Sequence, residues 1–529
     1  MKAHSSSVTS LGYLCFSMPE VYHSWAKVHN TLQESPSVFI VFDIIVKTIT
    51  LETTMFVDRQ QELAFLNSML TRKRPGPAQL VLMYGRRRVG KSELLLHWVE
   101  QSGLEYTYWE AVKENANQQR AHFFGKLLNV PATAAPVYRS WTDLWDAAAS
   151  QLLGKRRILI LDELPYAANA DSAMLSALQN AWDQHFQKSE IVIALCGSHV
   201  HTMETLLSKQ SPLFGRITAQ WHLEPLPFSS LTEFFPKWDP AERVAAYAII
   251  GGIPAYLNWL DPDLDLISNI RNVIMSPGST FMAEPAFLLY DEVREPASYL
   301  SILKAIGSGA HTLAEISDRA FLPSTSVNFY LQTLQELRLV ERRLPITLDR
   351  EQRSRSRSGR YHLSDPYFRF YFHFLEPYLS ASPVDPDRVI DNMRQNLRGF
   401  IGSTAFEELA RSWVIAQGKA GKLPFTPESV GSHWSRRAQV DVVAINRKTR
   451  DILLGECKWG EDTVSREIAL DLIENKTSLV LKDIWDGKGD WNVHYALFAR
   501  RGFTQAAKNE MQRYGGYLVD LKMIDKTLG

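Results

Sequence analysis

The chain has 529 residues, 45% of them apolar, and its 58 Lys and Arg side chains are balanced by 58 Asp and Glu side chains. This length exceeds what one hydrophobic core supports, so we expect several domains. The balanced charge excludes nucleic-acid binding through a globally basic surface, so any such contact must come from a local patch. Three cysteines without metal-binding spacing suit a reducing compartment, and no run of about 18 apolar residues occurs. We therefore expect a cytoplasmic protein with no membrane partner.

Residues 1–54 differ in composition from the rest of the chain. They begin Ser-rich and show no clear periodicity before a β-branched run at 38–54. They lack the cationic start and unbroken apolar core of a signal peptide. One interpretation is a loosely ordered or edge-strand extension. The other is that Met55 is the true start, because a regular domain pattern begins directly after it.

Residues 85–92 fit the phosphate-binding pattern G-x-x-x-x-G-K-[ST]. An apolar run at 79–84 precedes them and predicts a buried strand, and residues 93–99 have helical spacing. Gly85 and Gly90 would let successive N–H groups point at a phosphate at the start of the helix. Lys91 would reach the β- and γ-phosphates, and the Ser92 hydroxyl would bind Mg²⁺. We therefore predict an ATP site, in preference to a glycine-rich turn without a ligand.

From Phe56 onward the chain resembles the archaeal-type ATPase family, a branch of the AAA+ and STAND-like P-loop ATPases that also occurs in bacteria. Residues 56–63 are similar to the family's segment before the first helix, whose aromatic residue and arginine lie near the adenine. A second apolar strand, 156–163, ends in Asp162 and Glu163, as the Walker B motif requires. The resemblance implies that Asp162 holds Mg²⁺ through water and that Glu163 polarises the attacking water.

Three further segments resemble the same family. The strand 191–199 ends where the family has sensor 1, so Ser198 is a candidate for sensing the γ-phosphate, with His199 second. Arg216 is a candidate arginine finger, with an ordinary surface arginine as the alternative; action in trans would imply an oligomer. Residues 251–257 resemble a Gly-Gly-x-Pro turn in the helical lid. The residues assigned to nucleotide binding are Phe56, Arg59, Gly85, Arg86, Arg87, Arg88, Val89, Gly90, Lys91, Ser92, Glu93, Asp162 and Ser198.

Residues 299–374 predict short helices followed by a hairpin, the pattern of a winged helix-turn-helix. Thr312 and Glu315 form a capping-box signature, and apolar residues line one face of a longer helix that starts near Ser324. The loop between the two expected wing strands is rich in arginine and serine, which suits phosphate contacts with DNA. The alternative is a solvated wing tip in a domain that binds only protein. The arginines concerned are Arg350, Arg353, Arg355, Arg357 and Arg360.

The aromatic run 365–372 predicts a helix that packs between domains rather than stacking on bases. It resembles the linker before a C-terminal domain of unknown function that is often fused to these ATPases.

The strands 439–445 and 452–459 predict a hairpin that brings charged residues together. If Asn446 pairs with Asp451, Asp441 falls opposite Glu456, and Lys458 shares a strand face with Glu456. Carboxylates placed so can hold Mg²⁺ or Mn²⁺ while a lysine positions or deprotonates water for phosphodiester attack. A surface hairpin with a Glu-Lys pair is the alternative.

This arrangement resembles the D…E-x-K motif of restriction-endonuclease-like nucleases. That fold also places a glutamate on a preceding helix, and we favour Glu407 over Glu408 for this position. The resemblance thus assigns Glu407, Asp441 and Glu456 to a metal and Lys458 to catalysis.

Together these observations predict an α/β P-loop NTPase sheet with a helical lid, then a winged helix and an α/β nuclease-like domain. The expected function is ATP hydrolysis at Lys91 and Glu163 coupled to a DNA-binding, metal-dependent nuclease-like domain. The rival is a nucleotide-switched regulatory or DNA-binding protein with an inactive nuclease fold. The expected boundaries are 1–54 extension, 55–225 ATPase core, 226–295 lid, 296–376 winged helix and 377–529 nuclease-like domain.

Overall fold

The computed structural model describes residues 56–74, 76–293, 295–356, 358–379, 385–484, 487 and 489–529. The predictions for residues 1–54 and for a start at Met55 lie outside these residues. Within the described part, no helix has the length and apolarity needed to cross a membrane.

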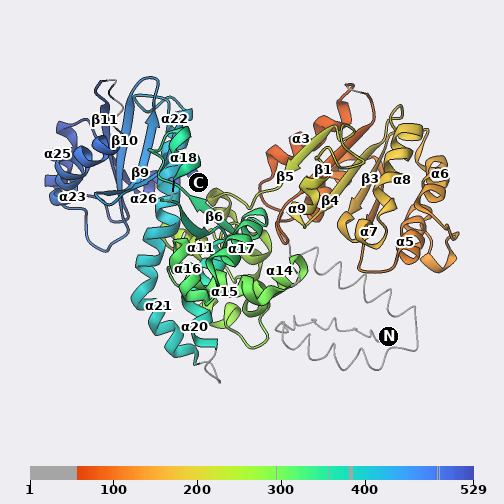
Figure 1. The fold of residues 1–529 in the computed structure, drawn as a ribbon, viewed down its shortest axis with the longest axis horizontal. Coiled ribbons are helices and arrows are strands. Elements are labelled where there is room, and N and C mark those ends of the chain that lie inside the picture. Colours follow the sequence, from red (N-terminus) through yellow and green to blue (C-terminus); the bar gives the residue numbers. More distant parts are fainter. Residues whose placement is uncertain are drawn as a thin grey trace, which may run out of the picture. The chain divides into compact units, whose positions relative to one another are not determined.

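The first sheet has five parallel strands in the order β2-β3-β4-β1-β5 (Figure 1). Strands β1, β3 and β4 are buried along almost their whole length, the pattern of a parallel sheet covered on both faces. The predicted α/β P-loop sheet is therefore confirmed. The strands are β1 (Gln79–Tyr84), β2 (Glu105–Glu110), β3 (Arg157–Asp162), β4 (Val192–Gly197) and β5 (Ala219–His222).

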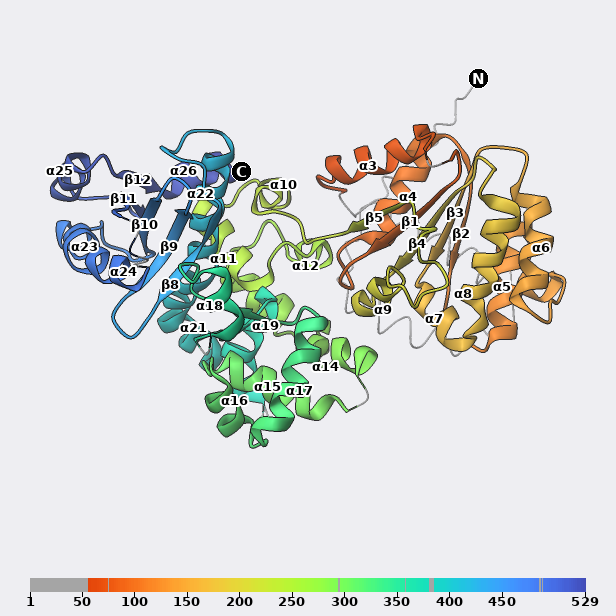
Figure 2. The same ribbon diagram turned by 45° about the horizontal axis from the view of Figure 1, so that its top comes forward.

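Helices cover this sheet, and α5, α6 and α8 lie together beside strands β2 and β3 (Figures 1 and 2). Their core is unusually aromatic, because Trp109 of β2 contacts both Phe123 of α5 and Trp141 of α6. The helices are α3 (Gln60–Thr71), α4 (Lys91–Ser102), α5 (Ala116–Leu128), α6 (Trp141–Leu152), α7 (Leu164–Ala170), α8 (Ala173–Ala181) and α9 (Val200–Thr205).

The helical lid follows, and its Gly-Gly turn packs against the chain that leaves the ATPase sheet. The Leu226 N–H donates to the Gly252 carbonyl at 2.7 Å. A Cβ at Gly252 would lie 1.8 Å from the Leu226 carbonyl oxygen, so the close approach requires glycine there. The lid helices are α10 (Leu231–Phe234), α11 (Pro240–Ile250), α12 (Pro254–Trp259), α13 (Leu266–Asn269) and α14 (Thr280–Glu292).

Three helices and a two-stranded hairpin form the next region. The predicted capping box of Thr312 and Glu315 is present, and Val327, Leu331 and Leu334 are buried on the third helix as expected. The helices are α15 (Pro296–Gly307), α16 (Leu313–Ala320) and α17 (Ser324–Glu336), and the antiparallel strands are β6 (Val340–Arg343) and β7 (Arg360–Leu363).

The loop between β6 and β7 differs from the arginine-rich wing that the sequence predicted. It contains a short helix, α18 (Arg350–Arg355), and the Ile346 N–H donates to the Ser432 carbonyl of the C-terminal sheet at 2.9 Å. Arg353 donates to the carbonyls of Ile346 and Leu348. Arg353 thus braces its own loop through these hydrogen bonds. The loop as a whole packs against the C-terminal sheet. Arg357 and the side chains of Arg350 and Arg355 are not among those described.

The aromatic segment after β7 is buried, which confirms the packing role predicted for it. Tyr367, Phe368 and Phe370 have no exposed surface, and Tyr367 contacts Tyr256 and Phe281 of the lid. The segment contains α19 (Pro366–Phe370), a short π-helix (Tyr371–Leu375) and α20 (Glu376–Leu379). Helix α21 (Pro386–Ile401) follows the undescribed residues 380–384.

The C-terminal domain contains a mixed sheet in the order β12-β11-β10-β9-β8. Asn446 pairs with Asp451 as predicted, and the ladder runs to Val442 and Gly455, one pair short of Asp441. The strands are β8 (Ser429–Trp434), β9 (Gln439–Asn446), β10 (Asp451–Lys458), β11 (Asn492–Ala499) and β12 (Tyr517–Asp520). The helices are α22 (Glu407–Lys419), α23 (Arg466–Leu470), α24 (Thr477–Asp483), α25 (Gln505–Arg513) and α26 (Leu521–Leu528), with a π-turn (Gly402–Phe406) before α22.

The Gly-Gly turn gives a stability prediction. Gly252→Ala forces the lid away from Leu226, so we expect a loss of about 1–3 kcal/mol and a lower thermal midpoint in scanning calorimetry. The control is Gly399→Ala in α21, where an added Cβ meets nothing within 4 Å and the helix gains stability. Equal midpoints for the two variants would contradict the close approach.

Candidate nucleotide and carboxylate sites

Two glycines shape the loop between β1 and α4. A Cβ at Gly85 would lie 2.4 Å from the Leu223 carbonyl oxygen, and Gly90 has a φ of +90° directly before α4. Helix α4 begins at Lys91, two residues before the predicted start. The loop therefore leads straight into a helix N-terminus, where backbone N–H groups favour an anion.

The side chain of Lys91 lies inside this loop. Its ammonium donates to the carbonyls of Gly85 at 2.9 Å and Arg86 at 3.1 Å, and the residue is only 5% exposed. A phosphate oxygen in the loop would offer the same group a charged acceptor in place of neutral carbonyls. Glu93 is exposed in the first turn of α4, outside this cluster.

Ser92 and the Walker B carboxylate are already in contact. The Ser92 hydroxyl donates to Asp162 Oδ2 at 2.5 Å, and the Tyr108 hydroxyl donates to the same oxygen at 2.8 Å. Burial and the neighbouring Asp162 raise the pKa of Tyr108, so this phenol remains a donor. A hydroxyl and a carboxylate placed side by side are the oxygen ligands that Mg²⁺ prefers, so these residues fit that ion.

Glu163 has a left-handed backbone conformation, with φ +46° and ψ +40°, at the end of β3. Its Oε2 accepts hydrogen bonds from the Ser198 N–H at 3.1 Å and the Ser198 hydroxyl at 2.9 Å. Ser198, predicted to sense the γ-phosphate, is therefore tied directly to Glu163. Positive φ is uncommon for glutamate, and it sets where this carboxylate points.

Arg59 forms a hydrogen bond with the backbone of the phosphate loop. Its guanidinium donates to the carbonyls of Val89 at 3.0 Å and Glu224 at 2.9 Å and pairs with Glu62. Phe56, at the start of the described chain, precedes it. The structure thus gives Arg59 a bracing contact with the phosphate loop.

Two arginines of the phosphate loop form ion pairs with buried acids from later domains. Arg86 pairs with Asp365, and Arg88 pairs with Glu284 of α14 at 2.6 Å. The carboxylate side chains are 4% and 2% exposed. The Tyr256 hydroxyl joins the two pairs, since it accepts from Arg86 and donates to Glu284.

Arg216 lies in a different setting from the one predicted for an arginine finger. Its guanidinium forms a bidentate pair with Asp183, with distances of 2.7–3.1 Å, and also donates to the carbonyls of Pro212 and Phe214. These contacts fit the alternative of a surface arginine in this conformation.

A cavity of about 860 Å³ adjoins Glu163, Ser198 and Arg87. The Gly-Gly turn and Arg338 also border it, and Arg216 does not.

The C-terminal acids lie at the end of the β9–β10 hairpin. Asp441 Oδ2 accepts from the Cys457 N–H at 3.0 Å. Glu456, 4% exposed, pairs with Lys458 at 3.1 Å and with Lys476 at 2.6 Å. Burial lowers the pKa of Lys458, but the Glu456 carboxylate outweighs it and raises that pKa overall. Lys458 is therefore held as a cation, whereas a general base must be neutral.

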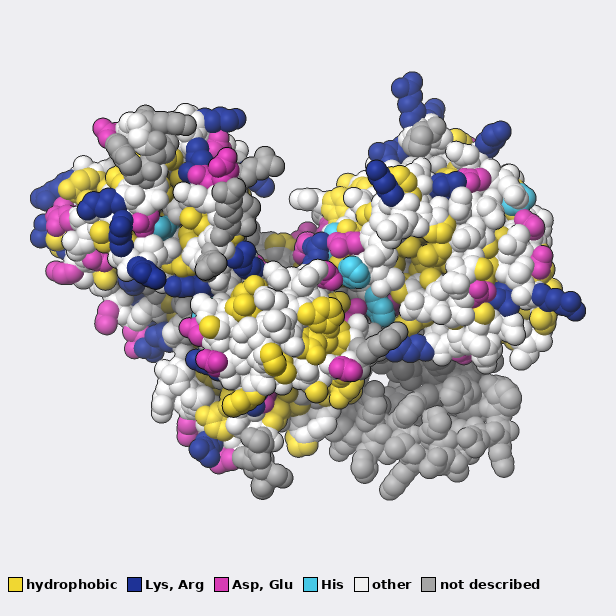
Figure 3. Space-filling model, viewed as in Figure 1, with side chains coloured by type: hydrophobic (Ala, Val, Ile, Leu, Met, Phe, Trp, Pro, Cys, Tyr) yellow, Lys and Arg dark blue, Asp and Glu magenta, His cyan; other side chains and the backbone are white. Residues whose placement is uncertain are grey.

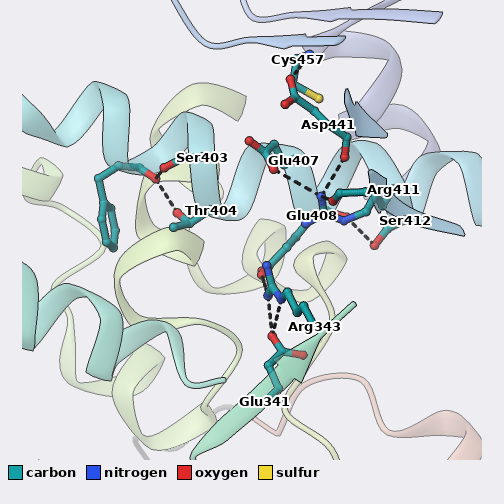
Figure 4. Close-up of polar contacts among 12 residues, drawn as sticks. Glu341, Arg343, Ser403, Thr404, Glu407, Glu408, Arg411, Ser412, Asp441 and Cys457 are labelled. Atoms are coloured by element: carbon teal, nitrogen blue, oxygen red, sulfur yellow. Dashed lines mark hydrogen bonds and ion pairs between the residues drawn. The ribbon is translucent and has the colours of Figure 1, made fainter. Parts of the chain in front are cut away.

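Helix α22 brings a third acid to this end of the sheet. Figure 4 shows Glu407 on the side of the helix that faces Asp441, with Arg411 bridging the Glu407 carboxylate and the Asp441 carbonyl. Burial and then Asp441 raise the pKa of Glu407 to about 8. Burial and then Glu456 raise the pKa of Asp441. Glu408 faces away and pairs with Arg343 and Arg369.

These carboxylates fit a hard divalent cation by their chemistry. Mutually repelling buried oxygens are relieved by a positive ion. Among the side chains that the structure describes, however, no three His, Cys, Asp or Glu groups are already gathered in metal-binding geometry. Glu456 would have to exchange its lysine partners for a metal.

Sequence reasoning missed several residues that hold these sites together. Arg411 follows Glu407 by four positions on a helix, so the i,i+4 rule could have found it. Tyr108, Glu284 and Lys476 had no such signal, because each comes from a separate element. Figure 3 shows Lys and Arg side chains interspersed with Asp and Glu on one face of the molecule, in keeping with the balanced composition.

The phosphate loop, the acids that end β3 and the helical lid together define the class: this is a P-loop ATPase. Residues 56–260 match the family described as an ATPase domain predominantly from Archaea. An uncharacterized protein of Methanocaldococcus jannaschii is 32% identical over 453 residues, which cover 84% of this chain and 96% of that protein. The chain therefore belongs to the archaeal-type ATPase family.

Other parts of the chain also have matches. Residues 299–344 match the IclR helix-turn-helix domain, and residues 371–469 match archaeal and bacterial proteins of unknown function. Among solved structures, the Walker-type ATPase of Pyrococcus abyssi is 19% identical with a TM-score of 0.40, covering 60% of this chain and 96% of that one. The Aeropyrum pernix ORC2 protein is 14% identical with a TM-score of 0.39, covering 64% and 94%.

The pair of Arg88 and Glu284 gives a second prediction. Arg88→Gln leaves a buried carboxylate without its cation, so we expect a loss of about 3–5 kcal/mol. Adding Glu284→Gln removes the stranded charge, so the double variant should recover part of that loss. Chemical denaturation of the two single variants and the double variant measures the coupling. Additive losses would show that the pair does not join the loop to the lid.

Proposed function

We propose that the chain hydrolyses ATP at the loop between β1 and α4. The observation that carries this proposal is the chain of contacts from Ser92 to Asp162 and from Glu163 to Ser198. Mg²⁺, held by Ser92 and Asp162, would neutralise charge on the β- and γ-phosphates. Lys91 binds the phosphate oxygens, Glu163 orients and polarises the attacking water, and Ser198 fixes the Glu163 carboxylate.

We propose that nucleotide binding and hydrolysis change the later domains through the two arginine pairs. Arg86 and Arg88 extend from the phosphate loop, and their partners lie in the lid and directly before α19. A bound triphosphate attracts the same guanidinium groups, so nucleotide binding and the buried pairs compete for them. Nucleotide turnover would thereby alter how the lid and the helix-turn-helix region are held.

The C-terminal domain is, in this proposal, a metal-dependent nuclease acting on DNA. The facing carboxylates of Glu407 and Asp441 support it, with Glu456 as a third ligand. A divalent cation there would supply Lewis-acid activation of the phosphodiester. Lys458, held as a cation, would position the water or stabilise the charge that develops on the phosphate, rather than act as the base.

The second candidate is a nucleotide-switched DNA-binding regulator whose nuclease fold is a scaffold. The observation that favours it is that Glu456 already forms ion pairs with Lys458 and Lys476. In this case the helix-turn-helix region binds DNA, and ATP sets its availability. Oligomer formation and a role for Arg216 in trans remain part of either proposal.

The nucleotide site is tested with two variants. We expect Lys91→Ala to abolish binding of a fluorescent ATP analogue, because the loop loses its cation. Glu163→Gln should still bind it and slow phosphate release by about 100-fold or more, since the carboxylate acts only in the hydrolytic step. Glu105→Gln, an exposed carboxylate at the opposite end of the sheet, is the control. Unchanged affinity in Lys91→Ala would overturn the site.

The nuclease site is tested with plasmid and short labelled DNA in Mg²⁺ or Mn²⁺, with and without ATP. We expect cleavage that chelation stops and that Asp441→Asn abolishes. Asp391→Asn, which removes an exposed carboxylate from α21, should cleave normally. Absence of metal-dependent cleavage in every nucleotide state would favour the regulator instead.

A further inference from the structure

A cleft of about 550 Å³ lies between the β6–β7 hairpin, helices α21 and α22, and strands β8 and β9. We call it the hairpin cleft. The hairpin side contributes Arg343 and Arg360, and Glu407 and Asp441 line the cleft from α22 and β9. The hairpin and the carboxylates therefore line one cleft, although more than 40 residues separate Arg360 from Glu407 in the sequence.

Arg360 is the cation of this cleft that has no acidic partner among the described side chains. Its guanidinium carbon lies 5.1 Å from the centroid of the Trp434 ring. The ring is itself fixed, because the Trp434 indole N–H donates to the Ser358 carbonyl at 2.9 Å. By contrast, Arg343 and Arg369 share the carboxylate of Glu408 (Figure 4 shows Arg343). Arg360 is thus held in place with its charge available to an anion.

The hairpin side of the cleft is electropositive. His362, which lies two residues after Arg360 on β7, has its pKa lowered to about 2 by burial and then by Arg343, His311, Arg369 and Arg360. Positive charge from several directions disfavours a further proton on the imidazole. Arg343 and Arg369 are paired with Glu408, so the positive charge that can attract a phosphate is that of Arg360.

The size and the walls of the cleft favour one strand over two. Its volume falls within the range of about 300–1,000 Å³ typical of small-ligand sites. It can therefore hold part of one strand but not the full width of a duplex, whose major groove alone is about 12 Å wide. Gly307, Gly309 and Gly399 line it, and a Cβ at Gly399 would meet nothing within 4 Å.

We propose that the hairpin cleft binds a single nucleic-acid strand, with Arg360 contacting a phosphate and the β6–β7 hairpin holding the strand against the carboxylates. The proposal rests on the proposed nuclease function, in that it names the substrate of that site. It gives the hairpin a different task from a wing that lies along duplex DNA.

The test measures binding of fluorescein-labelled oligothymidylate, oligouridylate and a blunt duplex of equal length to the full chain in EDTA, by anisotropy at several salt concentrations. We expect a single strand to bind more tightly than the duplex, and the first two probes to distinguish DNA from RNA. Arg360→Gln should weaken strand binding about tenfold and make the slope of log K against log salt shallower by about 0.7, the value of one lost phosphate contact. Arg360→Lys should restore most of the slope.

Two further variants separate the cleft from general charge. Arg342→Gln removes the neighbouring cation on β6, which is exposed and does not line the cleft, so strand binding should be unchanged. Gly399→Leu fills the cleft from a helix position that has room, so strand binding should fall while the thermal midpoint does not.

The outcomes distinguish this proposal from the nuclease itself. Equal losses in Arg360→Gln and Arg342→Gln, or duplex binding that is as tight as strand binding and depends on Arg360 to the same extent, overturn the cleft proposal. Metal-dependent cleavage that survives in both Arg360→Gln and Gly399→Leu leaves the nuclease standing and also overturns the cleft. Strand binding that depends on Arg360 without any cleavage by the wild type supports the cleft and rejects the nuclease.

Discussion

The burial of two carboxylates against the phosphate loop is the constraint on which the rest of the structure depends. Asp365 and Glu284 are almost fully removed from water, so each needs a cation, and Arg86 and Arg88 of the phosphate loop supply them. The loop that binds the phosphates is therefore also a structural contact of the lid and of the segment before α19.

Acidic side chains of the C-terminal domain are likewise paired with arginines. Arg411 bridges Glu407 and the Asp441 backbone, while Glu408, the next residue, turns to Arg343 of the hairpin. Adjacent glutamates on one helix thus serve two purposes, one facing the carboxylate site and the other fixing the hairpin beside it. The loop of the hairpin also packs on the C-terminal sheet, where the Ile346 N–H donates to the Ser432 carbonyl and Thr347 contacts His433.

Much of the local structure was readable from residue pattern. The buried strands β1, β3 and β4 are continuous apolar runs, the capping box of Thr312 and Glu315 formed, and the Asn446–Asp451 pairing followed from turn position. Composition left the role of the arginine-rich loop open, because it cannot tell a solvated cation from one that donates to nearby carbonyls. Arg353 does the latter.

The sequence by itself determined the phosphate loop, the order of its strand and helix, and the residue types of both sites, because these depend on spacing along a few residues. Only the tertiary structure decided which partners those residues take. Ser198 donates a hydrogen bond to Glu163, Arg86 forms an ion pair with Asp365, and Lys476 forms an ion pair with Glu456. Each pair joins separate elements, and its formation depends on burial. Desolvation and long-range packing, which no local pattern records, select among the acids and cations available.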